Sequence, residues 1–295
     1  MKEARALLLA GDSRRLASML VEDPDLPRRR FSDTSVPYDG YFHGATLLHH
    51  VAANPFIGDL PQNIEEMATL LLDSGADVDA ITLQGPSQPD DIGWTTLGLV
   101  ATSAAAREAG HQRSLMDLLI EAGADVDARN GGCIIGALYY GEADAAGYLA
   151  ARGARLDLAA AAGVGDIARM EALLATADES LLKARLADYG LARWPETADR
   201  SDVLGVALVY AALHGRVEAM EILLQAGADP NGRPPFDHHG TALHWAVMGD
   251  QPDAVGVLLD AGADPEAVDR SFDSTPEGWA RHLGKTRALE ALARD

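Results

Sequence analysis

The apolar positions of the chain gather in leucine-rich segments that end in the same three residues. In the four clearest cases the segment reads LLLDS, LLIEA, ILLQA or VLLDA, and a Gly-Ala-Asp triplet follows directly. The triplets begin at Gly75, Gly123, Gly227 and Gly262. Each segment predicts a helix, and glycine ends a helix readily because it adopts the left-handed conformation at little cost. The chain is therefore predicted to contain a series of helices with the same exit.

One stretch, residues 240–264, contains the complete unit, with the sequence GTALHWAVMGDQPDAVGVLLDAGAD. It predicts a tight turn, a short helix, a second turn, a second helix and the Gly-Ala-Asp exit. Within it, Thr241-Ala242-Leu243-His244 followed by Ala246 resembles the T-P-L-H-x-A signature of the ankyrin repeat. Thr46-Leu47-Leu48-His49 stands at the same place in an earlier unit. The last two triplets are 35 residues apart, close to the ankyrin period of roughly 33.

The resemblance implies an all-α ankyrin-repeat solenoid of about eight helix-turn-helix units, with insertions in several turns. It covers essentially the whole chain, so we expect a single ankyrin-repeat domain over residues 1–295. An N-terminal cap is expected at 1–23, an irregular segment at 24–43, an insertion at 179–202 and a C-terminal cap at 272–295. The repeats themselves are expected at 44–80, 92–128, 131–157, 158–178, 203–232 and 239–267.

Particular residue types in the unit have predicted structural roles. The threonine that opens the first helix caps free backbone N–H groups. The aspartate after Gly-Ala anchors the following turn through its own side chain. By resemblance to ankyrin repeats, the histidines at the fourth signature position, His49 and His244, bond to the backbone of neighbouring loops. Each unit is too small to bury its own apolar face, so the stack is expected to be held by contacts between neighbours.

Charge and cysteine content limit the classes of partner and the compartment. The 45 acidic and 24 basic residues give a net charge of −21, which disfavours nucleic acid and favours a basic protein partner. The single cysteine, Cys133, rules out an intrachain disulfide and indicates a reducing compartment. No apolar run has the roughly 18 residues needed to span a membrane. We therefore expect a cytoplasmic protein without a membrane partner.

The sequence lacks the common catalytic and cofactor motifs, so no catalytic residue, cofactor or metal site is assigned. Gly163-Val164-Gly165 resembles half of a dinucleotide fingerprint but has no third glycine. Asp237, His238 and His239 are adjacent, but their spacing does not bring three metal ligands together. Cys133 opens a predicted first helix, where we expect a small buried apolar side chain.

The first functional hypothesis is a non-enzymatic scaffold that binds another protein. In ankyrin proteins partners usually dock on the concave face, which is built from first helices and turn tips. Aromatic side chains there would act as rigid anchors. The candidate residues for this face are Trp94, Ser103, Tyr139, Tyr140, His214, Trp245 and Met248. Large rings are also highly buried on average, so an alternative is that Trp245 and Trp279 fill the interior of the stack.

The rival hypothesis comes from another functional class. The sequences of the central units diverge from the repeat pattern, and a long insertion follows Asp178. These features would suit a small-molecule-binding protein, or an unusual enzyme that uses histidine and tyrosine as general acid and base. The candidate pocket residues are His50, Asn54, Ser103, Tyr139, Tyr140 and His214. A small molecule is expected as a partner only under this rival hypothesis. The hypothesis requires a histidine with a shifted pKa beneath the insertions.

Overall fold

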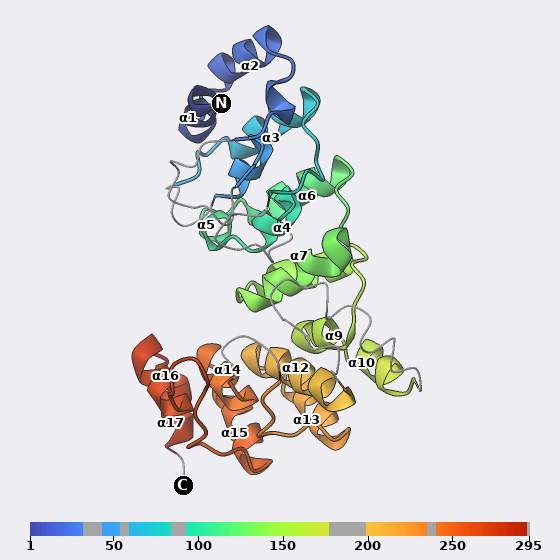
Figure 1. Ribbon diagram of the computed structural model, residues 1–295, viewed down its shortest axis with the longest axis vertical. Coiled ribbons are helices and arrows are strands. Elements are labelled where there is room, and N and C mark those ends of the chain that lie inside the picture. Colours follow the sequence, from blue (N-terminus) through green and yellow to red (C-terminus); the bar gives the residue numbers. More distant parts are fainter. Residues whose placement is uncertain (32–42, 54–58, 84–92, 177–198, 235–239, 294–295) are drawn as a thin grey trace. The chain divides into compact units, whose positions relative to one another are not determined.

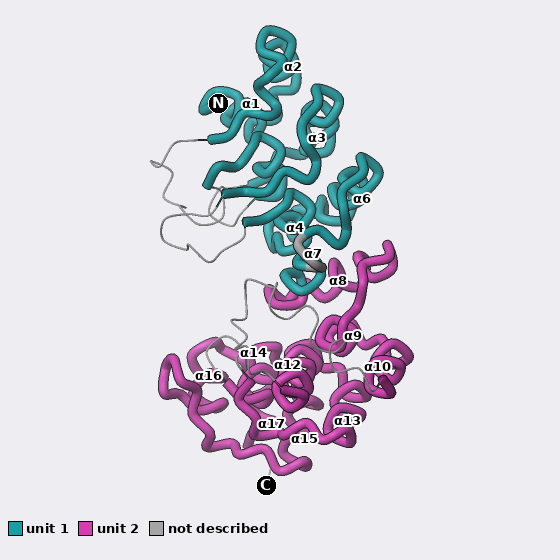
Figure 2. Tube along the Cα trace, turned by 45° about the vertical axis from the view of Figure 1, so that its right-hand side comes forward, with its two compact units in different colours: residues 1–137 teal, residues 138–295 magenta. Residues whose placement is uncertain are grey.

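The computed structural model describes residues 1–31, 43–53, 59–83, 93–176, 199–234 and 240–293. The described residues form helices and turns, with one isolated antiparallel bridge between Ile81 and Thr95. Figure 1 shows the order of the helices along the chain. The chain divides into two compact units, residues 1–137 and 138–295 (Figure 2), a division that the sequence did not indicate.

Unit 1 contains short helices that pack against one another. α2 contacts α3, α3 contacts α6, and α4 contacts both α6 and the 3-10 turn η2. The last helix, α7, crosses the boundary between the units. The elements are α1 (Lys2–Ala10), α2 (Ser13–Glu22), η1 (Leu26–Arg28), η2 (Leu48–Ala52), α3 (Ile64–Asp73), α4 (Thr96–Ala101), α5 (Ala104–Glu108), α6 (Gln112–Glu121) and α7 (Ala128–Tyr139).

Unit 2 is built from two rows of helices. The first helices make one row, in which α9 contacts α12, α12 contacts α14, and α14 contacts α16. The second helices make the other row, through α10, α13, α15 and α17. Figure 1 shows part of both rows, with α16, α14 and α12 above α17, α15 and α13. The bounds are α8 (Ala143–Ala151), α9 (Leu158–Val164), α10 (Ile167–Leu174), α12 (Arg200–Leu213), α13 (Val217–Gln225), α14 (Ala242–Met248), α15 (Pro252–Asp260), α16 (Pro276–Leu283) and α17 (Thr286–Leu292).

The predicted all-α fold is confirmed, but several predicted boundaries differ from the helices. The insertion predicted at 179–202 overlaps helix α12, which begins at Arg200. A capping box starts it there, because Asp199 accepts from the N–H of Asp202 and the Asp202 side chain accepts from the N–H of Asp199. Helix α7 begins at Ala128, before the repeat predicted at 131–157. The first helix of the repeat predicted at 44–80 is the 3-10 turn η2.

The predicted exits are confirmed in detail. Gly75 and Gly227 have φ angles of 86° and 97°, in the left-handed region. The aspartate two residues after each exit glycine accepts a hydrogen bond from the backbone N–H two residues further on. This occurs at Asp77, Asp125, Asp229 and Asp264, with distances of 2.9 to 3.1 Å. The side chain therefore closes each turn, as expected.

In unit 2 one asparagine links two successive exits. The Asn231 amide donates to the carbonyl of Gly262 at 2.9 Å and its oxygen accepts from the N–H of Asp264 at 2.7 Å. Asn231→Ala is expected to lower the free energy of unfolding by about 1 kcal/mol, because both bonds are lost at a site where water replaces them. Guanidinium unfolding followed by circular dichroism measures the change, with Gln225→Ala in α13 as the control. Equal stability of the two variants would show that the link contributes nothing.

Candidate functional site

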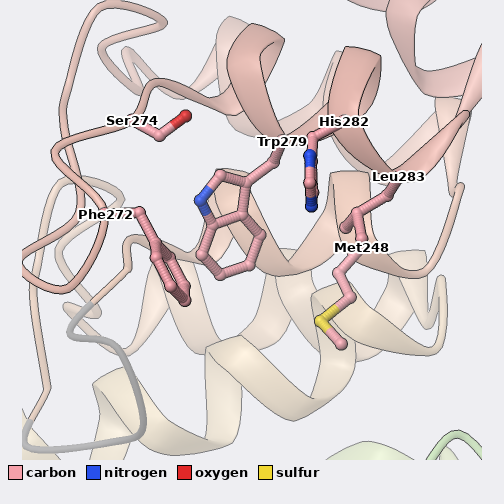
Figure 3. Close-up of a pocket in the computed structure, with 6 residues that line it drawn as sticks. All are labelled: Met248, Phe272, Ser274, Trp279, His282 and Leu283. Atoms are coloured by element: carbon pink, nitrogen blue, oxygen red, sulfur yellow. The ribbon is translucent and has the colours of Figure 1, made fainter.

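The candidate site lies at the first-helix row of unit 2, where a cavity of about 440 Å³ is lined mainly by apolar atoms. We call this cavity the hollow. Figure 3 shows the rings of Phe272, Trp279 and His282 in a row, with Met248 and Leu283 beside His282. Met248 ends α14, while Trp279, His282 and Leu283 belong to α16. The lining residues are Met248, Phe272, Ser274, Trp279, His282 and Leu283.

A continuous chain of ring contacts leads from α7 to the hollow. Tyr140 contacts Tyr139 edge to face with a centroid distance of 5.0 Å, and Tyr139 lies 6.3 Å from Trp245. Trp245 contacts Trp279 at 5.8 Å, and Trp279 contacts Phe272 at 6.5 Å. Edge-to-face pairs at such distances stabilise the packing beyond the area they bury. This ring ladder (Tyr140, Tyr139, Trp245, Trp279 and Phe272) joins three first helices and one loop of unit 2.

The ladder has buried members and exposed ends. Trp245 is 1% exposed and Trp279 is 6% exposed, whereas Tyr140 is 40% and Phe272 is 64% exposed. Met248 and Leu283, which line the hollow, are 37% and 42% exposed. Exposed large apolar side chains that lie close together mark interaction sites more often than scattered ones. The described surface of unit 2 therefore combines a rigid aromatic interior with accessible apolar side chains.

Asp269 holds the loop that carries Phe272. Its carboxylate accepts from the backbone N–H groups of Ser271 (2.7 Å), Phe272 (2.6 Å) and Ser274 (3.2 Å) and from the Trp279 indole N–H (2.9 Å). Burial by itself would raise the pKa of Asp269, but these hydrogen bonds lower the pKa below its ordinary value. The ionised carboxylate therefore fixes the loop and the orientation of Trp279 together.

His244 also holds this loop, through a hydrogen bond to the backbone of Ser274. Its Nδ1 accepts from the Thr241 N–H at 3.1 Å, and its Nε2 donates to the Ser274 carbonyl at 3.0 Å. The donor at Thr241 and the acceptor at Ser274 are both backbone groups, so the ring is neutral with its proton on Nε2. Burial lowers the pKa of His244 and keeps this form. His49 makes the equivalent bonds to Thr46, Ala80 and Trp94, so the predicted role of both histidines is confirmed.

The structure corrects the assignment of three predicted partner-binding residues. Trp94 is 5% exposed and packs on α7, where a Cβ at Gly136 would lie 2.8 Å from its ring. Trp245 belongs to the buried part of the ladder, as the alternative of a filled interior predicted for it and for Trp279. Ser103 is 3% exposed, caps α5 and donates to the Ala53 carbonyl at 2.8 Å. Trp94, Ser103 and Trp245 are therefore core residues and not surface anchors.

The remaining predicted partner-binding residues belong to unit 2. Tyr139, Tyr140 and Met248 lie in or beside the ring ladder. His214 is partly buried, and its Nε2 donates to the Leu138 carbonyl at 2.8 Å, next to Tyr139. Burial lowers the pKa of His214 to about 4, so the ring stays neutral and links α12 to the end of α7. Among these residues, Tyr140 and Met248 are the exposed ones.

The residues of the alternative pocket have structural contacts of their own. His50 is 2% exposed, donates from Nδ1 to the Thr46 carbonyl at 3.0 Å and lies 4.7 Å from the Phe31 ring. Burial lowers the pKa of His50 to about 3, too low for a general base near neutral pH. Asn54 lies outside the described residues. His50 and Ser103 belong to unit 1, while Tyr139, Tyr140 and His214 belong to unit 2.

One further cluster of titratable groups lies on the second helices of unit 1. The His111 Nδ1 is 2.7 Å from Glu65 Oε1, and the Ser114 hydroxyl donates to the same carboxylate. Burial by itself would raise the pKa of Glu65, but the hydrogen bonds from Ser114 and His111, together with a backbone hydrogen bond and the coulombic effect of His111, lower the pKa overall. The carboxylate stands between serine and histidine, so the histidine does not activate the hydroxyl. The cluster links α3 to α6.

No sequence motif marks Phe272, Ser274, His282 or Leu283, which line the hollow. The available signal was the string SFDSTPEGW, residues 271–279, which places an apolar residue in a polar loop just before a first helix. Cys133 is buried as predicted, at 2% exposure, with its Sγ 3.7 Å from the Thr95 hydroxyl. Asp237, His238 and His239 lie outside the described residues.

In the described ranges, no three His, Cys, Asp or Glu side chains are grouped as a metal site. Across the same part of the chain, no helix combines the length and the hydropathy that crossing a bilayer requires.

Comparison with protein-family models gives two matches that together span about half of the chain. Residues 158–269 match a model described as ankyrin repeats (3 copies), and residues 43–83 match a model described as ankyrin repeat. No characterised relative matches the chain. The first match covers α9 to α15, and the second contains His49 in its buried position. The signature residues, the helix rows and these matches agree, and we conclude that the chain belongs to the ankyrin-repeat family.

Proposed function

We propose that this chain is a non-enzymatic scaffold and that its partner protein docks on the first-helix row of unit 2. Ankyrin repeats are generally protein–protein interaction modules. The observation that carries the proposal is the exposure of large apolar side chains along the ring ladder and the hollow: Tyr140, Met248, Phe272 and Leu283. Anchors of this kind dominate interfaces when a rigid surface supports them.

The contacts that hold these exposed side chains in place favour a role in binding a partner protein over a purely structural role. Tyr140 rests on Tyr139, and Tyr139 contacts the buried Trp245. Phe272 lies in a loop fixed by Asp269 and His244. A preordered surface loses little conformational entropy when a partner binds, which increases the affinity obtained from each contact.

The acidic excess suggests a second feature of the partner. The net charge is −21, yet residues 270–293 contain four basic and three acidic side chains. We propose that a basic region of the partner contacts the other repeats while an apolar region covers the hollow. Such a complex forms more slowly at high salt, because distant charges that steer the encounter are screened.

The double variant Tyr140→Ala/Met248→Ala tests the binding surface. Pulldown from the native cell with the wild-type chain identifies the partner, and titration with that purified partner then measures affinity. We expect the double variant to weaken binding at least about tenfold, since each anchor contributes on the order of 1 kcal/mol. Val21→Ala in unit 1, which truncates a side chain that is 81% exposed, is the matched control. Equal affinities of all three proteins would place the interface elsewhere.

A further inference from the structure

The turn after α13 contains an asparagine followed directly by a glycine, Asn231-Gly232. An asparagine before glycine loses its side-chain amide more readily than other asparagines, because glycine has no side chain to shield its backbone nitrogen. A Cβ at Gly232 would lie 3.0 Å from the Asp229 carbonyl oxygen, so this turn favours glycine. Asn231 is exposed, and the turn therefore combines a reactive pair with access of water.

The reaction of such a pair needs no reagent except water. The Gly232 nitrogen gives its proton to hydroxide and forms a bond to the side-chain carbonyl carbon of Asn231. The bond from that carbon to the amide nitrogen breaks, and the nitrogen takes a proton from water and leaves as ammonia. Water then opens the cyclic imide at either of its two carbonyl carbons. The product is aspartate or isoaspartate, and nothing is oxidised or reduced.

In the folded turn, hydrogen bonds hold both reacting groups. The Gly232 N–H donates to the Asp229 carbonyl at 3.0 Å. The Asn231 amide donates to the Gly262 carbonyl at 2.9 Å and accepts from the Asp264 N–H at 2.7 Å. These bonds keep the proton on the nitrogen and hold the side chain against the next exit. The reaction therefore requires the turn to open, at the cost of these hydrogen bonds.

We propose that Asn231 is a site of spontaneous deamidation, that it reacts only when the link between the two exits opens, and that its modification stops the link from forming again. An aspartate carboxylate has no N–H to donate, so it would face the Gly262 carbonyl without the hydrogen bond that Asn231 makes. Isoaspartate lengthens the backbone and displaces the Asn231 N–H, which donates to the Asp229 carboxylate at 2.9 Å.

This inference goes beyond the proposed function, because it concerns how the stack of repeats ages and not what the stack binds. Each product replaces a neutral amide with a carboxylate and removes one connection between successive repeats. Neighbouring contacts hold a repeat stack together. A modified chain is therefore expected to be less stable in unit 2 than the chain from which it came.

Incubation of the purified full chain at mildly alkaline pH, followed by peptide mapping with mass spectrometry, measures the loss of the Asn231 amide. The same chain unfolded in urea gives the reference rate. We expect the folded chain to react about 25-fold more slowly, since opening gives up at least two hydrogen bonds that each change an equilibrium about fivefold. Equal rates in the two states overturn the proposal. Modification at the other Asn-Gly pair, Asn130-Gly131 within α7, before Asn231 also overturns it.

A variant that loosens the turn without changing the reacting pair tests the dependence on opening. Asp229→Ala removes the carboxylate that accepts from the Asn231 N–H and is expected to speed the loss of the amide about fivefold. Asp77→Ala removes the same kind of bond, to the N–H of Asp79, in unit 1, and should leave the rate at Asn231 unchanged. Equal rates in the two variants, or an intact Asn231 in Asp229→Ala, contradict the proposal.

The loss of the link is measured on the modified protein itself. Ion exchange separates chains that have gained the negative charge, and guanidinium unfolding followed by circular dichroism gives their midpoint. We expect this midpoint to be lower than that of unmodified chains and close to that of Asn231→Asp. Gly232→Ala, which shields the backbone nitrogen, should keep its amide and its own starting midpoint through the same incubation. Identical midpoints for modified and unmodified chains would show that the link forms again after deamidation.

Discussion

Trp245→Ala is expected to destabilise unit 2 by about 3 to 5 kcal/mol, the largest effect of any single truncation considered in this chain. Trp245 is 1% exposed and contacts both Tyr139 and Trp279. Removing it leaves a cavity between three first helices that cannot collapse, because each of them is held by its own neighbours. The same change should loosen the exposed ends of the ring ladder.

Guanidinium unfolding followed by far-UV circular dichroism measures this change. A chain of repeats need not unfold in one step, so the transition assigned to unit 2 is compared between proteins. Met248→Ala, at the end of the same helix and 37% exposed, is the control and should lose less than about 1.5 kcal/mol. A Trp245 variant as stable as the Met248 variant would mean that the ladder is not part of the core.

Acidification from pH 7 to pH 5 is expected to destabilise unit 1 by about 4 kcal/mol. Burial lowers the pKa of His49 to about 4 and that of His50 to about 3, from an ordinary value of 6.5. Between pH 6.5 and about pH 4, these two histidines bind protons in the unfolded chain but not in the folded chain. Stability is therefore full above pH 6.5 and falls as the pH decreases toward 4, with about 2 kcal/mol lost for each histidine at pH 5.

The variant His50→Asn separates this effect from other titrations. Its amide can replace the Nδ1–H that donates to the Thr46 carbonyl, but it does not titrate. Urea unfolding at pH 7, 6 and 5 should show a slope about half that of the wild type. Carboxylates contribute little in this range, because their ordinary pKa values lie near 4. An unchanged slope would show that His50 does not titrate with unfolding.

The repeated exits made the fold predictable, whereas the burial of single residues was not. Glycine, alanine and aspartate recur because the same turn recurs, so their spacing marks the units. In α14, however, Ala242 to Val247 are all buried, since α12, α15 and α16 surround the helix. A helix without a solvent-exposed face shows no periodic alternation of apolar and polar residues. The position of Trp245 in the sequence therefore did not distinguish a buried residue from a surface anchor.

The candidate site was predictable only in part for a related reason. Tyr140 and Met248 lie near the ends of first helices, where the repeat pattern leaves the side chain unspecified, and both are exposed. The hollow depends on tertiary contacts between α14, α16 and the loop around Phe272. Those contacts rest on Asp269, which in the sequence is one aspartate among many. The start of α12 was missed because its capping residues adjoin a segment without a repeat pattern.

The hydrogen bonds that Asp269 and His244 make to the loop of Phe272 have a kinetic consequence. A protein that meets this ring finds it already in place, so the encounter includes no slow folding of the loop. Association should then proceed at roughly 10⁵ to 10⁷ M⁻¹s⁻¹, the range set by diffusion and orientation. Substitutions in the surface would alter mainly the lifetime of a complex, while a change at Asp269 would slow its formation.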